Sequence, residues 1–186
     1  MTDVDIVGLD LSLTSTGICH GKSMQAFSSK LKGVERLVDI EEAVLRFLYN
    51  ETEHETPCVI VEGYSFGSKN SQAHSIGELG GVIRRALHIE QIPFVVVPPT
   101  VRAKFATGKG NASKGEVLSS VSARTGIVWS GPGADDMCDA FILEECGLTH
   151  IGRPRYQWPA LNMSALDKVD WSPLDNYSKE LSVERI

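Results

Sequence analysis

The chain has 186 residues, which is enough for one domain with an extension but not for two full domains. Hydrophobic residues make up 42% of it and charged residues 23%, a mix that excludes a disordered or fibrous chain. With 18 Lys and Arg against 24 Asp and Glu, the formal net charge is −6, so the chain does not bind nucleic acid through its overall charge. A role on nucleic acid would need a local basic patch.

The cysteines and the apolar runs indicate the cellular compartment in which the protein is found. The four cysteines form no CxxC pair and lie in apolar segments, which argues against a zinc site and for buried, reduced thiols. The first residues carry two acids before any apolar run, unlike a signal peptide, and no stretch approaches the roughly 18 apolar residues of a membrane span. We therefore expect a soluble cytoplasmic protein with no membrane association.

Hydrophobic periodicity and turn residues predict an alternation of strands and helices. In chain order we expect a strand at 4–11, a hairpin at 17–20 and 24–27, a helix at 35–49, a strand at 58–62, a helix at 71–90, a strand at 94–97, a Lys/Gly segment at 104–114, a helix ending near 124, and a last helix at 134–146. This order predicts an α/β protein with a mixed central sheet and helices on both faces. Residues 1–150 form this domain, and residues 151–186, which show no sustained period, are an extension that is packed or partly disordered.

Two acids interrupt apolar strands near their carboxyl ends. Asp10 lies between Leu9 and Leu11, and Glu62 follows the second central strand. Ionised carboxylates are costly to bury unless they are paired or bound to a metal, and ligand sites in open α/β sheets gather at the carboxyl ends of strands. The structural alternative for either acid alone is a cap of the following loop or helix.

The last predicted helix adds three acids, Asp135, Asp136 and Asp139. The spacing places Asp139 on one helix face with either of the other two, where like charges destabilise a helix unless a cation neutralises them. The alternative is that the first two acids favour the positive helix N-terminus, which best accounts for Asp135. A set of three or four carboxylates suits Mg²⁺ or Mn²⁺, and two such ions about 4 Å apart can clamp the attacking and leaving oxygens of a phosphodiester.

A local excess of positive charge lies between the strands and the last helix. It consists of Arg102, Lys104, Lys109, Lys114 and Arg124, with Glu116 as the only acid. This segment is a candidate DNA contact, with a solvated charged loop as the alternative. Ser113 and Glu116 have the spacing of a capping box, which places Lys114 in the first turn of a helix, where a cation is unfavourable. Tyr64 and Phe66 follow Glu62 in a Gly/Ser loop and could stack on unpaired bases or pack in the core.

Four motifs in order carry a family resemblance. The segments Gly8-Leu9-Asp10-Leu11-Ser12 with Thr16-Gly17, Val61-Glu62, Gly110-Asn111-Ala112-Ser113-Lys114 and Asp136-Met137-Cys138-Asp139-Ala140 resemble those of the RuvC-type Holliday junction resolvases. The similarity covers roughly residues 4–148. The acidic chain and its tail look more like phage-encoded members than cellular ones.

The resemblance implies an RNase H-like fold and a homodimer, with the helix at about 71–90 supplying much of the dimer contact. It implies a crossover junction endodeoxyribonuclease of DNA recombination and repair that nicks four-way junctions, with flaps as a further candidate substrate, and leaves 5′-phosphate and 3′-hydroxyl ends. The carry-over gives Asp10, Glu62, Asp136 and Asp139 as ligands of two Mg²⁺ ions, with Asp135 as a substitute for Asp136. Lys114 becomes a phosphate or transition-state contact. The setting would be the cytoplasm of a bacterium or of a phage-infected host.

Two other functions fit part of the sequence. The segment from Gly8 to Gly17 also resembles the first phosphate loop of actin-like sugar kinases and ATPases, which need two such domains and a second phosphate loop. A branched-DNA-binding relative that does not cut is the other alternative, and the presence of all four acids disfavours it. The nuclease prediction is therefore preferred.

Overall fold

The computed structural model describes residues 4–52, 57–63 and 72–183, and it contains one five-stranded sheet. The strands are β1 (Ile6–Asp10), β2 (Thr16–His20), β3 (Ser23–Phe27), β4 (Cys58–Glu62) and β5 (Phe94–Val97). The helices are α1 (Gly33–Glu51), α2 (Gln72–Ile89), α3 (Pro99–Thr107), α4 (Lys114–Thr125), α5 (Ala134–His150), α6 (Ala160–Met163), the short 3₁₀ helix η1 (Ser164–Lys168) and α7 (Ser172–Val183). None of the described helices combines the length and apolar character needed to cross a membrane.

The strand order of the sheet is β3-β2-β1-β4-β5. β1 pairs in parallel with β4, and β4 pairs in parallel with β5, whereas β2 is antiparallel to both of its neighbours. The carboxyl ends of β1, β4 and β5 therefore lie at one edge of the sheet. Leu9 is in register with Val61, which places Asp10 and Glu62, the next residues of the two strands, side by side. The predicted mixed sheet is confirmed, and the β4 and β5 boundaries match the prediction.

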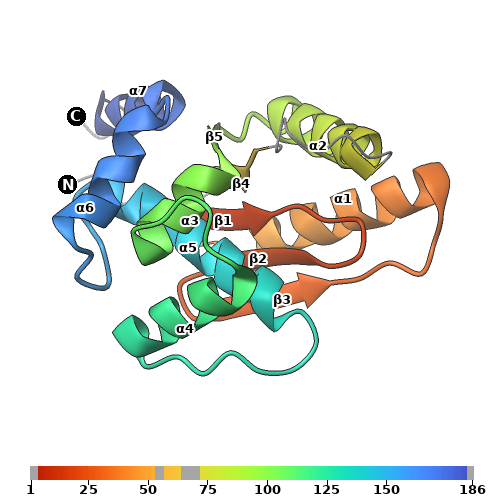
Figure 1. The fold of residues 1–186 in the computed structure, drawn as a ribbon. Helices are drawn as coiled ribbons and strands as arrows, with labels where there is room; N and C mark the ends of the chain where they lie inside the picture. The colour runs from red at the N-terminus through yellow and green to blue at the C-terminus, as the bar shows by residue number, and fades with distance from the viewer. Residues whose placement is uncertain (1–3, 53–56, 64–71, 184–186) are drawn as a thin grey trace.

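Helices cover both faces of the sheet, as predicted (Figure 1). On one face, α1 and α2 pack on Val7, Leu9 and Val59, which alternate along the strands with the residues that face the other side. On the second face, Ile6 and Ile60 belong to a larger core built with α3, α4, α5 and the C-terminal tail. Both faces of the two central strands are thus buried, which explains their nearly continuous apolar sequence.

Two glycines let α5 lie directly on the backbone of the sheet. A Cβ added at Gly8 would lie 1.9 Å from the Ala140 carbonyl oxygen, and one at Gly17 would lie 2.1 Å from the Asp136 carbonyl oxygen. No side chain fits at either position, so the helix approaches β1 and β2 more closely than any other residue would permit. This contact brings the acidic start of α5 to the carboxyl end of β1.

The structure differs from the sequence prediction in two helices. A Lys/Gly segment is expected from residue 104, but α3 covers Pro99–Thr107, because Pro99 occupies the first helical position and Val101 and Phe105 face the core. α5 continues one turn beyond the predicted end, to His150. The tail contains α6, η1 and α7 and packs on the second face. The predicted capping box of Ser113 and Glu116 is present at the start of α4.

A buried ionic network fastens the tail to α5. Glu144 and Glu145 are only 2% and 0% exposed. Arg155 bridges them, with its Nε 2.6 Å from Glu145 Oε1 and an Nη 2.7 Å from Glu144 Oε2. The indole of Trp158 donates a 2.9 Å hydrogen bond to Glu145, and Cys19 of β2 donates one to Glu144. One network thus joins the sheet, α5 and the start of the tail. Sequence reasoning missed it, although two adjacent acids in an otherwise buried helix were a usable signal.

Candidate active site

Three carboxylates from three elements meet at the carboxyl edge of the sheet. Asp10 ends β1, Glu62 ends β4, and Asp139 lies in the second turn of α5, where the close contact at Gly8 and Gly17 places it. Asp10 is 6% exposed and Asp139 is 5% exposed. The structure therefore brings together three of the four acids that the sequence singled out, although Glu62 is 52 residues from Asp10 and 77 residues from Asp139 along the chain.

The guanidinium of Arg102 lies between these carboxylates. Its Nε donates to Glu62 and one Nη donates to Asp139, so a single side chain from the first turns of α3 bridges β4 and α5. The Arg102 side chain is 12% exposed. The sequence placed Arg102 in a basic, DNA-facing segment, but the structure turns it inward to the acidic cluster. The pairing spans 40 and 37 residues of sequence, a separation at which no local pattern identifies partners.

The pKa values of the cluster reflect burial and an excess of negative charge. Burial and the neighbouring Glu62 raise the pKa of Asp10 well above its usual range. Burial likewise raises the pKa of Asp139 to about 7, although Arg102 opposes the shift. Burial disfavours the Arg102 cation, but Glu62 and Asp139 outweigh it and raise the pKa of the guanidinium. The three acids share one arginine, and the pKa values of Asp10 and Asp139 are raised because their ionisation would place further negative charge in a poorly solvated site. A bound cation would favour the ionised forms of both acids.

The other two acids of α5 have different surroundings. Asp136 is 9% exposed, and burial raises its pKa while a hydrogen bond from Ser15 opposes that rise. Asp135 is more exposed and forms an ion pair with Lys114, which lowers its pKa. Asp136 acts electrostatically on Asp139, so it lies nearest the cluster after the three central acids. The sequence alone does not predict the hydrogen bond between Ser15 and Asp136.

The remaining basic residues are spread over several contacts. Lys114 pairs with Asp135 beside the acidic cluster, and the exposed Lys109 lies 3.6 Å from Glu116. Lys104 lies on α3 and is half-buried. Arg124 instead donates a 3.0 Å hydrogen bond to the Gln157 carbonyl and lies over the Trp158 ring, which attaches it to the tail. Tyr64 and Phe66, the two candidate stacking aromatics, lie outside the described residues.

The donor chemistry of the cluster fits a divalent cation of the Mg²⁺ type. All of its acidic members are carboxylates, Asp10 and Asp139 are buried, the Glu62 side chain is 17% exposed, and a single arginine contacts the cluster. In the part of the chain that the structure describes, however, no three acidic, histidine or cysteine side chains are arranged to hold an ion as they stand. Arg102 lies between Glu62 and Asp139.

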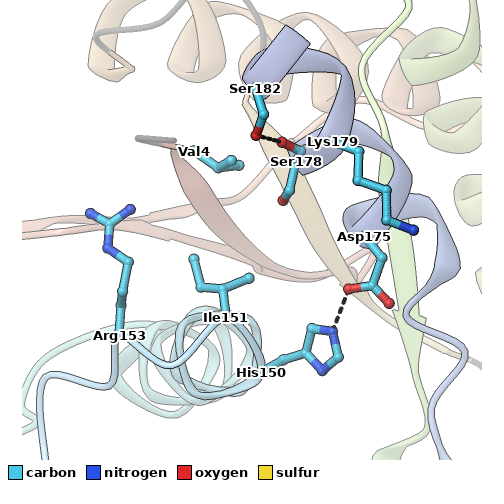
Figure 2. A pocket seen from close by; sticks show the side chains of 8 residues that line it. All are labelled: Val4, His150, Ile151, Arg153, Asp175, Ser178, Lys179 and Ser182. Atoms are coloured by element: carbon cyan, nitrogen blue, oxygen red, sulfur yellow. Dashed lines mark hydrogen bonds and ion pairs between the residues drawn. The ribbon is translucent and has the colours of Figure 1, made fainter. Parts of the chain in front are cut away.

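A separate pocket of about 500 Å³ lies at the other end of β1, away from the carboxylates. Figure 2 shows it between the end of α5 and α7, with a 2.7 Å hydrogen bond between His150 and Asp175 on one side and Arg153 on the other. Val4, which precedes β1, lines it, whereas Asp10 ends the same strand. The pocket is therefore not part of the candidate site.

Comparison with known proteins gives a consistent result. No protein-family model matches the chain. The crossover junction endodeoxyribonuclease RuvC of Carboxydothermus hydrogenoformans is 25% identical over 154 residues, which cover 79% of this chain and 97% of the relative. The structure of Thermus thermophilus RuvC in complex with a Holliday junction substrate has a TM-score of 0.59 at 21% identity, covering 83% of this chain and 100% of that one. The yeast mitochondrial Holliday junction resolvase Ydc2 has a TM-score of 0.51 at 10% identity, covering 96% of this chain and 83% of its own.

The sheet order, the helices on both faces and the acids at the carboxyl ends of the central parallel strands define an RNase H-like fold, as the sequence predicted. Within this class, the chain is similar in sequence and fold to RuvC-type Holliday junction resolvases, which confirms the resemblance carried by its motifs. The sequence relative carries the name crossover junction endodeoxyribonuclease, which favours the nuclease prediction over the actin-like alternative.

Proposed function

We propose that this chain is a Holliday junction resolvase, a crossover junction endodeoxyribonuclease that nicks four-way DNA with the help of divalent metal ions. The observation that carries the proposal is the convergence of Asp10, Glu62 and Asp139 at one edge of an RNase H-like sheet. The RuvC relatives, whose names state this activity, support it. A purely structural role would not account for three carboxyl groups that share one arginine at a site where burial raises the pKa of Asp10 and Asp139.

The acids would hold two Mg²⁺ ions, for which Mn²⁺ would substitute. Asp10, Glu62, Asp139 and Asp136 are the proposed ligands, with Asp136 preferred to Asp135 because it is the more buried and Asp135 is paired with Lys114. When bound, the ions would activate a water molecule and stabilise the leaving 3′ oxygen, so that the products carry 5′-phosphate and 3′-hydroxyl ends. The oxygen-only donor set supports these ions over zinc.

The lysines of α3, α4 and the turn between them would position the DNA. Lys114, which is 68% exposed, is close enough to Asp139 to act on it electrostatically, so its ammonium group could neutralise charge on the phosphate that is cut. Lys104 and Lys109 would contact phosphates further along the strand and fix the register without reading sequence. Because Arg124 contacts the tail, we leave it out of the DNA-binding set.

The partners follow from the reaction. Two strands of a four-way junction must be cut symmetrically, which a homodimer with α2 in its interface would accomplish. Flaps and other branched DNA are further candidate substrates.

The protein would act in the cytoplasm of a bacterium or phage-infected cell, where this DNA is found. The nuclease domain would comprise residues 1–150, with the packed tail as its extension.

Removal of one carboxylate charge tests the proposal. We expect Asp10→Asn to retain junction binding and to lose cutting, because the substitution changes the charge that holds the metal while keeping the size of the side chain. Asp167→Asn, which makes the same change at an exposed position of η1, is the matched control and should cut like the wild type. Cutting by Asp10→Asn at the wild-type rate would overturn the assignment of the metal site.

A further inference from the structure

Arg102 occupies the place that a metal ion would need. Its guanidinium donates to Glu62 and to Asp139 and interacts electrostatically with Asp10, so it contacts or faces each of the three central acids. We propose that Arg102 is a built-in competitor of the metal: in the DNA-free protein it holds the carboxylates together, and it must leave them before a divalent cation can bind. This inference rests on the proposed function, because it assigns the same three acids to the metal.

The geometry explains why the two cations exclude each other. A guanidinium is a planar fork that can donate to two carboxylates at once, and here it uses the oxygen atoms Glu62 Oε1 and Asp139 Oδ1, which an ion would also need. A divalent cation between the same groups would lie within a few ångströms of the guanidinium, where repulsion in a poorly solvated site is strong. The arginine is not titrated away at any physiological pH, so the exchange requires the side chain to move.

A displaced Arg102 would be close in sequence to the proposed DNA contacts. It lies in the first turns of α3, whose residue Lys104 and following Lys109 are proposed phosphate contacts. A guanidinium released from Glu62 and Asp139 loses its anionic partners, and a DNA phosphate is an anionic partner that the substrate brings. DNA and metal would then favour each other's binding, because the metal releases Arg102 for a DNA phosphate and the phosphate keeps Arg102 away from the metal ligands. This coupling is reciprocal. The competition would keep the DNA-free enzyme poorly loaded with metal.

Titration of the DNA-free protein with Mg²⁺ alone tests the proposal. Isothermal titration calorimetry of wild type, Arg102→Gln and Lys104→Gln compares the removal of the competing cation with the removal of the same charge two residues away on the same helix. We expect Arg102→Gln to bind Mg²⁺ at least tenfold more tightly than wild type and Lys104→Gln to stay within about threefold. In EDTA, we expect Arg102→Gln to have the lowest melting temperature of the three, and saturating Mg²⁺ to restore most of the loss.

The outcomes separate the two proposals. Equal or weaker Mg²⁺ binding by Arg102→Gln would show that the arginine only supports the acids, and the competition would be refuted while the metal site stands. If none of the three proteins binds Mg²⁺, the metal site itself is wrong and both proposals fall. A gain in affinity that Lys104→Gln matches would reduce the effect to general electrostatics and also refute the competition.

A measurement on the wild-type protein covers the possibility that Arg102→Gln does not fold. In protein labelled with ¹⁵N-arginine, the Nε–H of Arg102 should give a signal protected from exchange with water, because its hydrogen bond to Glu62 is shielded from solvent. Assignment is made by the loss of this signal in Arg102→Lys. We expect Mg²⁺ at a concentration that saturates the calorimetric titration to abolish the protection. An unchanged Arg102 signal in the Mg²⁺-saturated protein would refute the displacement.

Discussion

Substitution of Gly8 by alanine should destabilise the fold strongly, because the added methyl group would collide with the backbone of α5. The added Cβ would lie 1.9 Å from the Ala140 carbonyl oxygen and 2.6 Å from the Glu144 backbone nitrogen, and neither atom can rotate away. Since ordinary contact begins near 3.4 Å, α5 must move from β1 by about 1.5 Å. Overpacking of this kind costs roughly 3 kcal/mol, which corresponds to a fall in melting temperature of about 6–12 °C for a chain of this size.

Urea denaturation of Gly8→Ala beside Gly115→Ala measures this effect. Gly115 lies in the first turn of α4, and nothing is within 4 Å of a Cβ built there. Alanine at this position should therefore be neutral or stabilise the protein by up to about 1 kcal/mol. If Gly8→Ala unfolds within about 0.5 kcal/mol of wild type, the direct contact between α5 and the sheet is wrong, and with it the placement of Asp139 beside Asp10.

Three further predictions follow from the ionic groups. Arg155→Ala leaves Glu144 and Glu145 buried without their cation. It should therefore lower the free energy of unfolding, measured by urea denaturation at neutral pH, by about 3–5 kcal/mol. A loss below about 1 kcal/mol would contradict the buried ionic network. In EDTA, the wild-type protein should lose stability as pH rises from about 4 to about 7, because Asp139, whose pKa is raised to about 7, keeps its proton in the folded chain but has released it in the unfolded chain. Asp139→Asn should flatten this dependence of stability on pH, and parallel profiles of the two proteins would refute the assignment. Lys114→Ala should cut a junction about a hundredfold more slowly, while its affinity for the junction falls by less than about tenfold. Lys109→Ala should lower the affinity alone. Equal losses of rate and affinity in Lys114→Ala would show that Lys114 only binds a phosphate.

The sequence predicted the features that depend on local pattern. The apolar runs 58–62 and 94–97 have the strand boundaries seen in the structure, and the Ser113 and Glu116 capping box is present as expected. Acids at strand ends also identified Asp10 and Glu62 as neighbours, because the carboxyl ends of parallel strands meet at one edge.

Features that depend on distant partners could not be read in the same way. α3 was missed because the prolines that stop β5 also begin a helix, and only the core that receives Phe105 decides between these readings. Arg102 has the composition of a surface cation, and its partners are 40 and 37 residues away. The tail shows no period because its helices are short, yet Trp158 and Trp171 are buried against the domain.

A cleavage assay on defined DNA tests the central claim most directly. Purified wild-type protein is incubated with a labelled four-way junction, a flap and a linear duplex of the same sequence, with Mg²⁺ or with EDTA. We expect paired symmetric nicks in the junction, no cutting of the duplex, and no cutting of any substrate in EDTA. Cutting of the flap as well would extend the substrate range with the same metal site. An intact junction in Mg²⁺, or junction cutting that persists in EDTA, would contradict the assignment of this acidic cluster as a metal-dependent resolvase site.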